Sequence, residues 1–167
     1  MKHKVMWVLL LCVVGYVVIG QFTNVRPEAV ELNQVTPSFM LQTLEQEQWT
    51  EAQLSDNGTI LNFWASYCAP CVKEMPLLQT AYEQGVDIWG VNTGESVFRI
   101  DAFLKNMSTT FPILRDADKV ATTKFEVMAL PTTYFIDGNG VVRKKVTGEL
   151  TEQQLREGIL LIQKGAM

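Results

Sequence analysis

The chain has 167 residues, of which 47% are apolar and 19% charged, a mixture typical of a globular protein and too hydrophobic for a disordered one. With 14 basic and 18 acidic residues the net charge is −4, so the sequence lacks the basic surplus typical of nucleic-acid binding. Three cysteines and a single histidine, His3, are too few for a tetrahedral zinc site, and we expect neither a metal ion nor another cofactor.

The first predicted element is a membrane anchor at residues 1–20. Lys2 and Lys4 precede an uncharged and almost wholly apolar run from Val5 to Gly20, which is slightly shorter than the roughly 17–25 residues of a spanning helix. Because positive flanking charges stay in the cytoplasm, we expect a single-pass protein of the cell membrane, with the rest of the chain on the extracytoplasmic side. A cleaved signal peptide and a lipoprotein signal ending at Cys12 are the alternatives.

A polar segment follows at residues 21–35, where Arg26, Pro27 and Glu28 interrupt any regular element. We interpret this segment as a stem between the membrane and one folded domain at residues 36–167. No internal repeat or low-complexity tract divides that domain, so a single hydrophobic core is expected in it.

Within the domain, strands are predicted to alternate with helices. Buried strands are expected at 59–65 and 87–92, joined by a helix that starts near Cys68 and is kinked at Pro76. The remaining predictions, in chain order, are an amphipathic helix at 97–107, an extended piece at 111–114, a short helix at 119–125, a hairpin of strands at 132–136 and 141–146, and a helix that starts at Thr151. This order predicts an α/β fold with a central mixed sheet covered by helices on both faces.

The cysteines Cys68 and Cys71 lie one helical turn apart at the predicted strand-to-helix junction. Free N–H groups and the positive dipole end of a helix stabilise a thiolate, so Cys68 is the expected nucleophile. Cys71, further into the helix, is the expected resolving thiol. Such a pair exchanges with a protein disulfide through a mixed disulfide. Cys12 has no comparable surroundings and is interpreted as an apolar membrane residue.

The sequence from Asn62 to Cys71, followed by Lys73-Glu74-Met75-Pro76, resembles the active-site stretch of thioredoxin-like proteins. More narrowly, it is similar to the membrane-anchored extracytoplasmic reductases of the TlpA and ResA type. The resemblance continues through 36–39 and 130–137, and so covers almost the whole predicted domain. It implies a thioredoxin-like fold and an enzyme that reduces extracytoplasmic proteins, such as apocytochrome c before haem attachment or proteins of spore formation. It also implies a membrane thiol-disulfide protein as the electron donor.

The resemblance assigns two further site residues. Pro131 falls on the family's cis-proline beside the dithiol, and its neighbour Leu130 borders the expected substrate groove. Glu74 lies three residues after Cys71 on the same helix. It is the expected proton carrier, because Asn62 stands where thioredoxins proper keep a buried aspartate. The alternatives are a trans proline that starts a strand and an exposed glutamate that merely complements the helix dipole.

The sequence is also compatible with other functions. The same cysteine pair can form or shuffle disulfides instead of reducing them. Peroxiredoxins share the outer fold, but their reactive cysteine follows a threonine by three residues, where this chain has Ala65. A non-catalytic binding domain is a further alternative. Trp64 and Tyr67, which flank the motif, belong either to the core or to the partner groove.

Overall fold

The computed structural model describes residues 32–164. The predicted anchor at residues 1–20 and most of the predicted stem lie outside the described residues. Within residues 32–164, no helix is long and apolar enough to cross a membrane.

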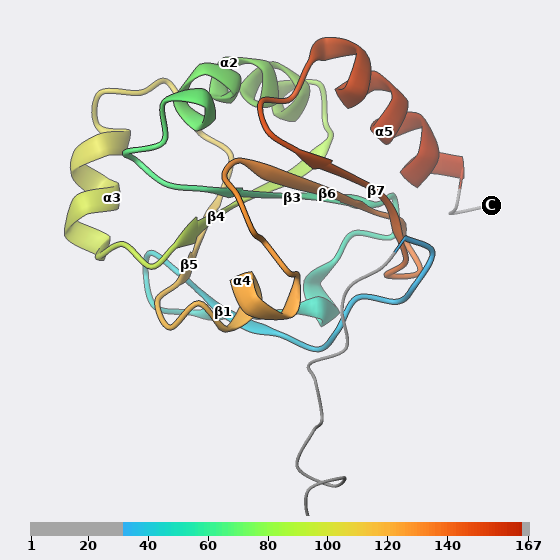
Figure 1. Cartoon of the computed structure of the whole chain (residues 1–167), viewed down its shortest axis with the longest axis horizontal. Coiled ribbons are helices and arrows are strands. Elements are labelled where there is room, and N and C mark those ends of the chain that lie inside the picture. Colours follow the sequence, from blue (N-terminus) through green and yellow to red (C-terminus); the bar gives the residue numbers. More distant parts are fainter. Residues whose placement is uncertain (1–31, 165–167) are drawn as a thin grey trace, which may run out of the picture.

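Strands and helices alternate along the described chain in the predicted order. The strands are β1 (Met40–Thr43), β2 (Gln48–Thr50), β3 (Thr59–Trp64), β4 (Asp87–Thr93), β5 (Ile113–Asp116), β6 (Thr132–Ile136) and β7 (Val142–Thr147). The helices are the 3-10 turn η1 (Glu51–Gln53) and the α-helices α2 (Ala69–Glu83), α3 (Val97–Leu104), α4 (Val120–Lys124) and α5 (Glu152–Lys164). The strands form one mixed sheet in the order β2-β1-β5-β4-β3-β6-β7, with α2 and α5 on one face and α4 on the other (Figure 1).

The central strand β3 is buried on both faces. Ile60 and Trp64 belong to the apolar cluster under α2, α3 and α5, whereas Leu61 and Phe63 belong to the cluster on the α4 side. Because successive side chains of a strand point to opposite faces, a continuous apolar sequence is what a strand between two helical layers needs. The buried strand predicted at 59–65 is therefore confirmed.

The pairing of β3 positions the functional residues. It runs parallel to β4, with Trp64 opposite Asn92, and antiparallel to β6, with Phe63 opposite Thr132. The ends of β3 and β4 and the start of β6 therefore lie at the same end of the sheet. Cys68, which follows β3, and the segment before Pro131, which precedes β6, therefore come together there although they are distant in the sequence.

Some details differ from the sequence predictions, and β5 begins two residues later than the extended piece predicted at 111–114. The structure adds β1, β2 and η1 before β3, where no element was predicted. Helix α3 ends at Leu104 instead of residue 107, because Asn106 and Met107 donate to carbonyls three residues back and form turns. Helix α2 contains Pro76 in its interior, and the Thr80 hydroxyl donates to the Pro76 carbonyl at 2.9 Å; the kink at Pro76 stays a prediction.

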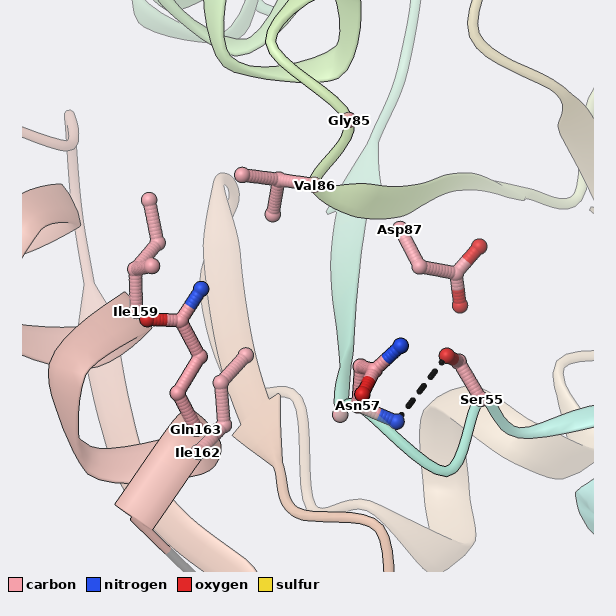
Figure 2. Close-up of a pocket in the computed structure, with 9 residues that line it drawn as sticks. Ser55, Asn57, Gly85, Val86, Asp87, Ile159, Ile162 and Gln163 are labelled. Carbon is pink, nitrogen blue, oxygen red and sulfur yellow. Dashed lines mark hydrogen bonds between the residues drawn. The ribbon is translucent and has the colours of Figure 1, made fainter. Parts of the chain in front are cut away.

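A small pocket of about 70 Å³ lies at the opposite end of the strands, between the starts of β3 and β4 and the end of α5 (Figure 2). Its carboxylate, on Asp87, accepts hydrogen bonds from the Thr59 hydroxyl at 2.5 Å and the Trp89 indole at 3.0 Å. The Ser55 hydroxyl likewise accepts from the backbone of Asn57 at 3.2 Å (Figure 2). These polar groups already have hydrogen-bond partners within the protein. The candidate site lies at the other end of the sheet.

Candidate active site

Cys68 and Cys71 form a disulfide at the start of α2. Cys68 is the N-cap residue of the helix, and its Sγ accepts a hydrogen bond from the backbone N–H of Cys71 at 3.3 Å. Cys68 is 9% exposed and Cys71 1% exposed. Both are mostly buried, but Cys68 is the more exposed residue, as an attacking cysteine has to be. The assignment of the attacking and resolving roles stays a prediction.

The loop before the disulfide is held by a buried carboxylate, Glu95, which follows β4. The backbone N–H and the hydroxyl of Ser66 donate to its two oxygens at 2.7 and 2.6 Å, and the Asn92 amide donates at 2.8 Å. Arg99 forms an ion pair with it at 3.4 Å. Burial opposes ionisation of this carboxyl, but the hydrogen bonds and Arg99 outweigh burial and hold its pKa below the ordinary value. Glu95 therefore fixes the backbone two residues before Cys68.

Sequence reasoning did not single out Glu95. The only signal in the sequence is its place just after the predicted strand 87–92, at the end of the sheet where the cysteines also lie. A glutamate in a loop is ordinarily solvated, and nothing local indicates that Ser66 will reach it.

Glu74 is buried in the first half of α2, with only 2% of its surface exposed. One carboxylate oxygen accepts a hydrogen bond from the Asn62 amide at 2.7 Å, and the other accepts from the backbone N–H of Leu150 at 2.6 Å. Burial raises the pKa of Glu74 to about 7; the two hydrogen bonds oppose the rise, and the charge of Glu149 adds to it. The exposed-glutamate alternative is wrong, and Glu74 titrates near neutral pH.

Asn62 links Glu74 to the strand that follows Pro131. Its side-chain N–H₂ donates both to Glu74 and, at 3.0 Å, to the hydroxyl of Thr133 in β6. Its carbonyl oxygen Oδ1 is buried and has no hydrogen-bond partner among the described residues. The amide is thus oriented so that both of its donors face acceptors, which favours the ionised form of Glu74.

Replacing Asn62 by leucine is expected to raise the pKa of Glu74 further. The substitution keeps the side chain's approximate size but removes the donor, and a hydrogen bond to a charged group contributes about 1.5 kcal/mol, or roughly one pH unit in the titration midpoint. The midpoint is measured from the carboxyl carbon of Glu74 by NMR. Glu149→Gln is the matched control and shifts the midpoint in the opposite direction, because it removes a neighbouring negative charge. An unchanged midpoint in Asn62→Leu contradicts the assigned role.

The Leu130–Pro131 peptide bond is cis. Pro131 is buried directly before β6, and its carbonyl accepts a hydrogen bond from the Gly148 N–H at 2.8 Å. Leu130 is half-buried beside it. The trans-proline alternative is wrong, while the part of Pro131 in substrate binding stays a prediction.

The two aromatic residues that flank the motif have different surroundings. Trp64 is fully buried and packs against Phe103 with ring centroids 5.4 Å apart, so it belongs to the core. Tyr67 is exposed at the surface next to Cys68. Within residues 32–164, no group of three or more histidine, cysteine or acidic side chains is arranged to hold a metal ion.

Comparison with known proteins identifies the family. Residues 32–145 match the family model described as "AhpC/TSA family". The chain belongs to this thioredoxin-like family. It is 34% identical over 159 residues to the thiol-disulfide oxidoreductase ResA of Geobacillus thermodenitrificans, covering 93% of this chain and 91% of that protein. It is also 33% identical to ResA of Bacillus subtilis, covering 94% of this chain and 89% of that protein.

A solved structure agrees with these relatives. The crystal structure of StoA from Bacillus subtilis superposes with a TM-score of 0.64 at 29% identity, covering 74% of this chain and 97% of that one. The thioredoxin-like fold predicted from the sequence is confirmed, as is the resemblance to the ResA type. With its Cys68–Cys71 disulfide, the protein is a thiol-disulfide oxidoreductase of the thioredoxin-like kind.

Proposed function

We propose that the protein reduces disulfide bonds of other proteins on the extracytoplasmic side of the cell membrane, where residues 1–20 anchor it. The observation that supports reduction of the partner's disulfide, instead of its formation, is the environment of the two sulfurs. Among the described residues no cationic side chain hydrogen-bonds to either sulfur, and the one donor is the backbone N–H of Cys71. A strong oxidant needs a strongly stabilised reduced form, and here the Cys68 thiolate is stabilised by the N-terminus of α2 and this one N–H, with no cation to add to them.

Buried Glu74 also favours a reducing pair. When it is ionised, its negative charge one turn after Cys71 disfavours a second negative charge on the sulfur. A reduced pair that is poorly stabilised passes its electrons on readily, which is what a reductant does.

The reduction proceeds in two exchange steps. The Cys68 thiolate attacks one sulfur of the partner's disulfide, which forms a mixed disulfide and releases the partner's other sulfur as a thiolate. Cys71 then gives its proton to Glu74, and its sulfur attacks Cys68. The Cys68–Cys71 disulfide forms and expels the partner's second sulfur as a thiolate. The partner has gained two electrons, and it becomes a dithiol by taking up one proton from Glu74 and one from water. The electrons return from a membrane thiol-disulfide donor, and Pro131 borders the groove that holds the partner.

The resemblance to ResA-type proteins names the candidate partners, which are apocytochrome c before haem attachment and proteins of spore formation. No cofactor is needed, since both electrons reside in the cysteine pair. Peroxidase chemistry is not supported, because Ala65 stands where the activating threonine of a peroxiredoxin is needed.

The reduction potential of the pair tests this proposal. The full-length protein in a mild detergent is equilibrated with dithiothreitol and glutathione couples, and the oxidised fraction is followed by tryptophan fluorescence and by thiol alkylation. We expect a potential at or below about −230 mV, in the range of thioredoxins and glutaredoxins. A value near about −120 mV, that of a strong oxidant, overturns the reducing direction and makes the protein a disulfide donor.

A further inference from the structure

A groove lies beside the disulfide, between the loop that carries Cys68 and the segment before Pro131. It has a volume of about 140 Å³, and its lining includes Tyr67, Thr93, Lys119, Met128 and Leu130. Sites for small molecules typically occupy roughly 300–1,000 Å³. The groove is therefore suited to one side chain of a polypeptide and too small for a cofactor.

Two walls of this groove are apolar and open to solvent. Tyr67, next to Cys68, is 68% exposed, and Met128, three residues before Pro131, is 91% exposed. Large apolar side chains that gather on an exposed surface mark interaction sites, and methionine adapts its shape to different partners. These walls indicate contact with a protein segment that brings its disulfide to Cys68.

Lys119 is the single charged residue in the lining of the groove. Its ammonium group makes no hydrogen bond or ion pair with any side chain or carbonyl in the described range. Two carboxylates of the neighbouring turns are already engaged: Asp116 accepts from the backbone N–H groups of Ala121 and Thr122 at 3.1 and 2.6 Å, and Glu95 accepts from Ser66 and Asn92. Asp118, next to Lys119 in the sequence, is exposed and forms no ion pair with it. A positive charge is therefore left free to attract a carboxylate from outside.

The stem of Lys119 lies near the turn that follows β4. A Cβ on Gly94 would come within 2.8 Å of the Lys119 Cε, so the two residues are neighbours. Gly94 belongs to the same turn as Glu95, whose carboxylate accepts from Ser66 in the loop before Cys68. Lys119 itself is exposed, at the start of α4. Its charge therefore lies at the end of the sheet where the disulfide lies.

We propose that this groove binds an extended segment of the protein substrate beside its disulfide, with an apolar side chain between Tyr67 and Met128 and an acidic side chain on Lys119. The inference rests on the proposed disulfide reduction and adds a sequence preference to it. Complementary charge favours productive encounters and suppresses wrong partners. Substrate cysteines with a neighbouring aspartate or glutamate are therefore reduced faster than cysteines in a basic context.

Matched peptide substrates test this preference. Three disulfide peptides differ only at one position near the cysteine, which is Glu, Gln or Lys, and all carry a leucine on its other side. The full-length reduced protein is mixed with each peptide, and the second-order rate constant is measured at low ionic strength. We expect Glu to react about two- to fivefold faster than Gln, in line with one solvated ion pair, and Lys to react more slowly than Gln. At 0.5 M salt the differences shrink.

Two variants separate Lys119 from the general charge of the protein. Lys119→Glu is expected to reverse the order of the three peptides. Lys105→Glu makes the same change of charge at the C-terminal end of α3, outside the lining of the groove, and is expected to leave the order unchanged. Equal rates for the three peptides with the wild type, or equal effects of the two variants, overturn the inference.

A small neutral disulfide distinguishes this inference from the proposed function. Bis(2-hydroxyethyl) disulfide carries no charge, so the wild type and Lys119→Glu are expected to reduce it at the same rate. If the small disulfide is reduced but peptide charge has no effect, the groove preference alone fails. If neither the small disulfide nor any peptide is reduced, disulfide reduction itself fails, and the inference fails with it.

Discussion

Cys68→Ser is expected to lose disulfide exchange completely, down to the rate of the uncatalysed mixture. Cys71→Ser is expected to keep the first step and to accumulate a mixed disulfide with its substrate. The reason is the difference in access, since Cys68 is the more exposed residue and caps the helix while Cys71 is enclosed. Intact-protein mass spectrometry without reductant measures the covalent adduct, and a thiol assay measures turnover.

Cys12→Ser supplies the control for these two variants. Cys12 is interpreted as an apolar membrane residue, so its substitution is expected to change neither turnover nor adduct formation. An adduct that forms with Cys68→Ser and not with Cys71→Ser reverses the assigned roles. Turnover that survives in both variants removes the pair from the mechanism.

Glu74→Gln is expected to slow the resolving step by about 10²-fold or more above pH 7, the usual contribution of a positioned acid or base. The wild-type rate is expected to rise with pH through about 7, where the Glu74 carboxyl ionises and can accept the proton of Cys71. Glutamine cannot ionise, so this inflection disappears in the variant. Rapid-mixing measurements of the decay of the mixed disulfide between pH 5 and 9 show the difference.

The same substitution has an effect on stability with a defined sign. The pKa of Glu74 rises from 4.5 to about 7 in the folded protein, so between these values the folded state holds a proton that the unfolded chain releases. Stability is therefore lost as pH rises through this interval, by up to about 3 kcal/mol. Glu74→Gln is expected to escape this loss, and to gain stability relative to the wild type as pH increases from 5 to 8.

Urea unfolding of the oxidised full-length protein at several pH values measures this difference. Glu149→Gln is the comparison variant, because it keeps the Glu74 carboxyl but removes a neighbouring charge that raises its pKa; the loss of stability with pH is expected to persist at a smaller size. A difference between wild type and Glu74→Gln that is independent of pH contradicts a raised pKa. In the rapid-mixing experiment, a pH profile of mixed-disulfide decay that Glu74→Gln leaves unchanged between pH 5 and 9 removes Glu74 from the mechanism.

The parts of the fold that the sequence predicted are those in which burial is continuous or strictly periodic. The strand at 132–136 has the predicted bounds, and 59–65 differs from β3 by one residue, because apolar β-branched and aromatic residues fill these segments and turn signals flank them. The cysteine pair was equally predictable, since its spacing and its place at a strand-to-helix junction are local properties.

Two short strands were not predicted, because each is too short to show an alternating hydrophobic pattern in the sequence. β1 and β2 contribute one buried side chain each, Leu41 and Trp49, so no alternating pattern develops. Their turn contains Gln46 in a left-handed conformation with φ of 69°, where glycine or asparagine would have indicated a hairpin. Only packing within the finished sheet stabilises such a pair.

The hydrogen-bond partners of the site residues could not be predicted from local sequence patterns either. Asn62 was noted only for the aspartate it replaces, and the sequence gives no sign that Leu150 will donate to Glu74 or that Glu95 will hold Ser66. Such contacts depend on the crossing of strands and helices that are distant in sequence.

The disulfide is local, whereas the surroundings of Glu74 are long-range. Cys68 and Cys71 are three residues apart, but the hydrogen-bond partners of Glu74 lie 12 and 76 residues away. An unfolded chain can therefore close its disulfide while it lacks the buried carboxyl of Glu74. If Glu74 carries the proton as proposed, we expect newly made or damaged molecules to have cysteines no more reactive than those of a short peptide. We expect full reactivity at neutral pH only in molecules that have completed folding, which would limit unwanted exchange with other unfolded chains.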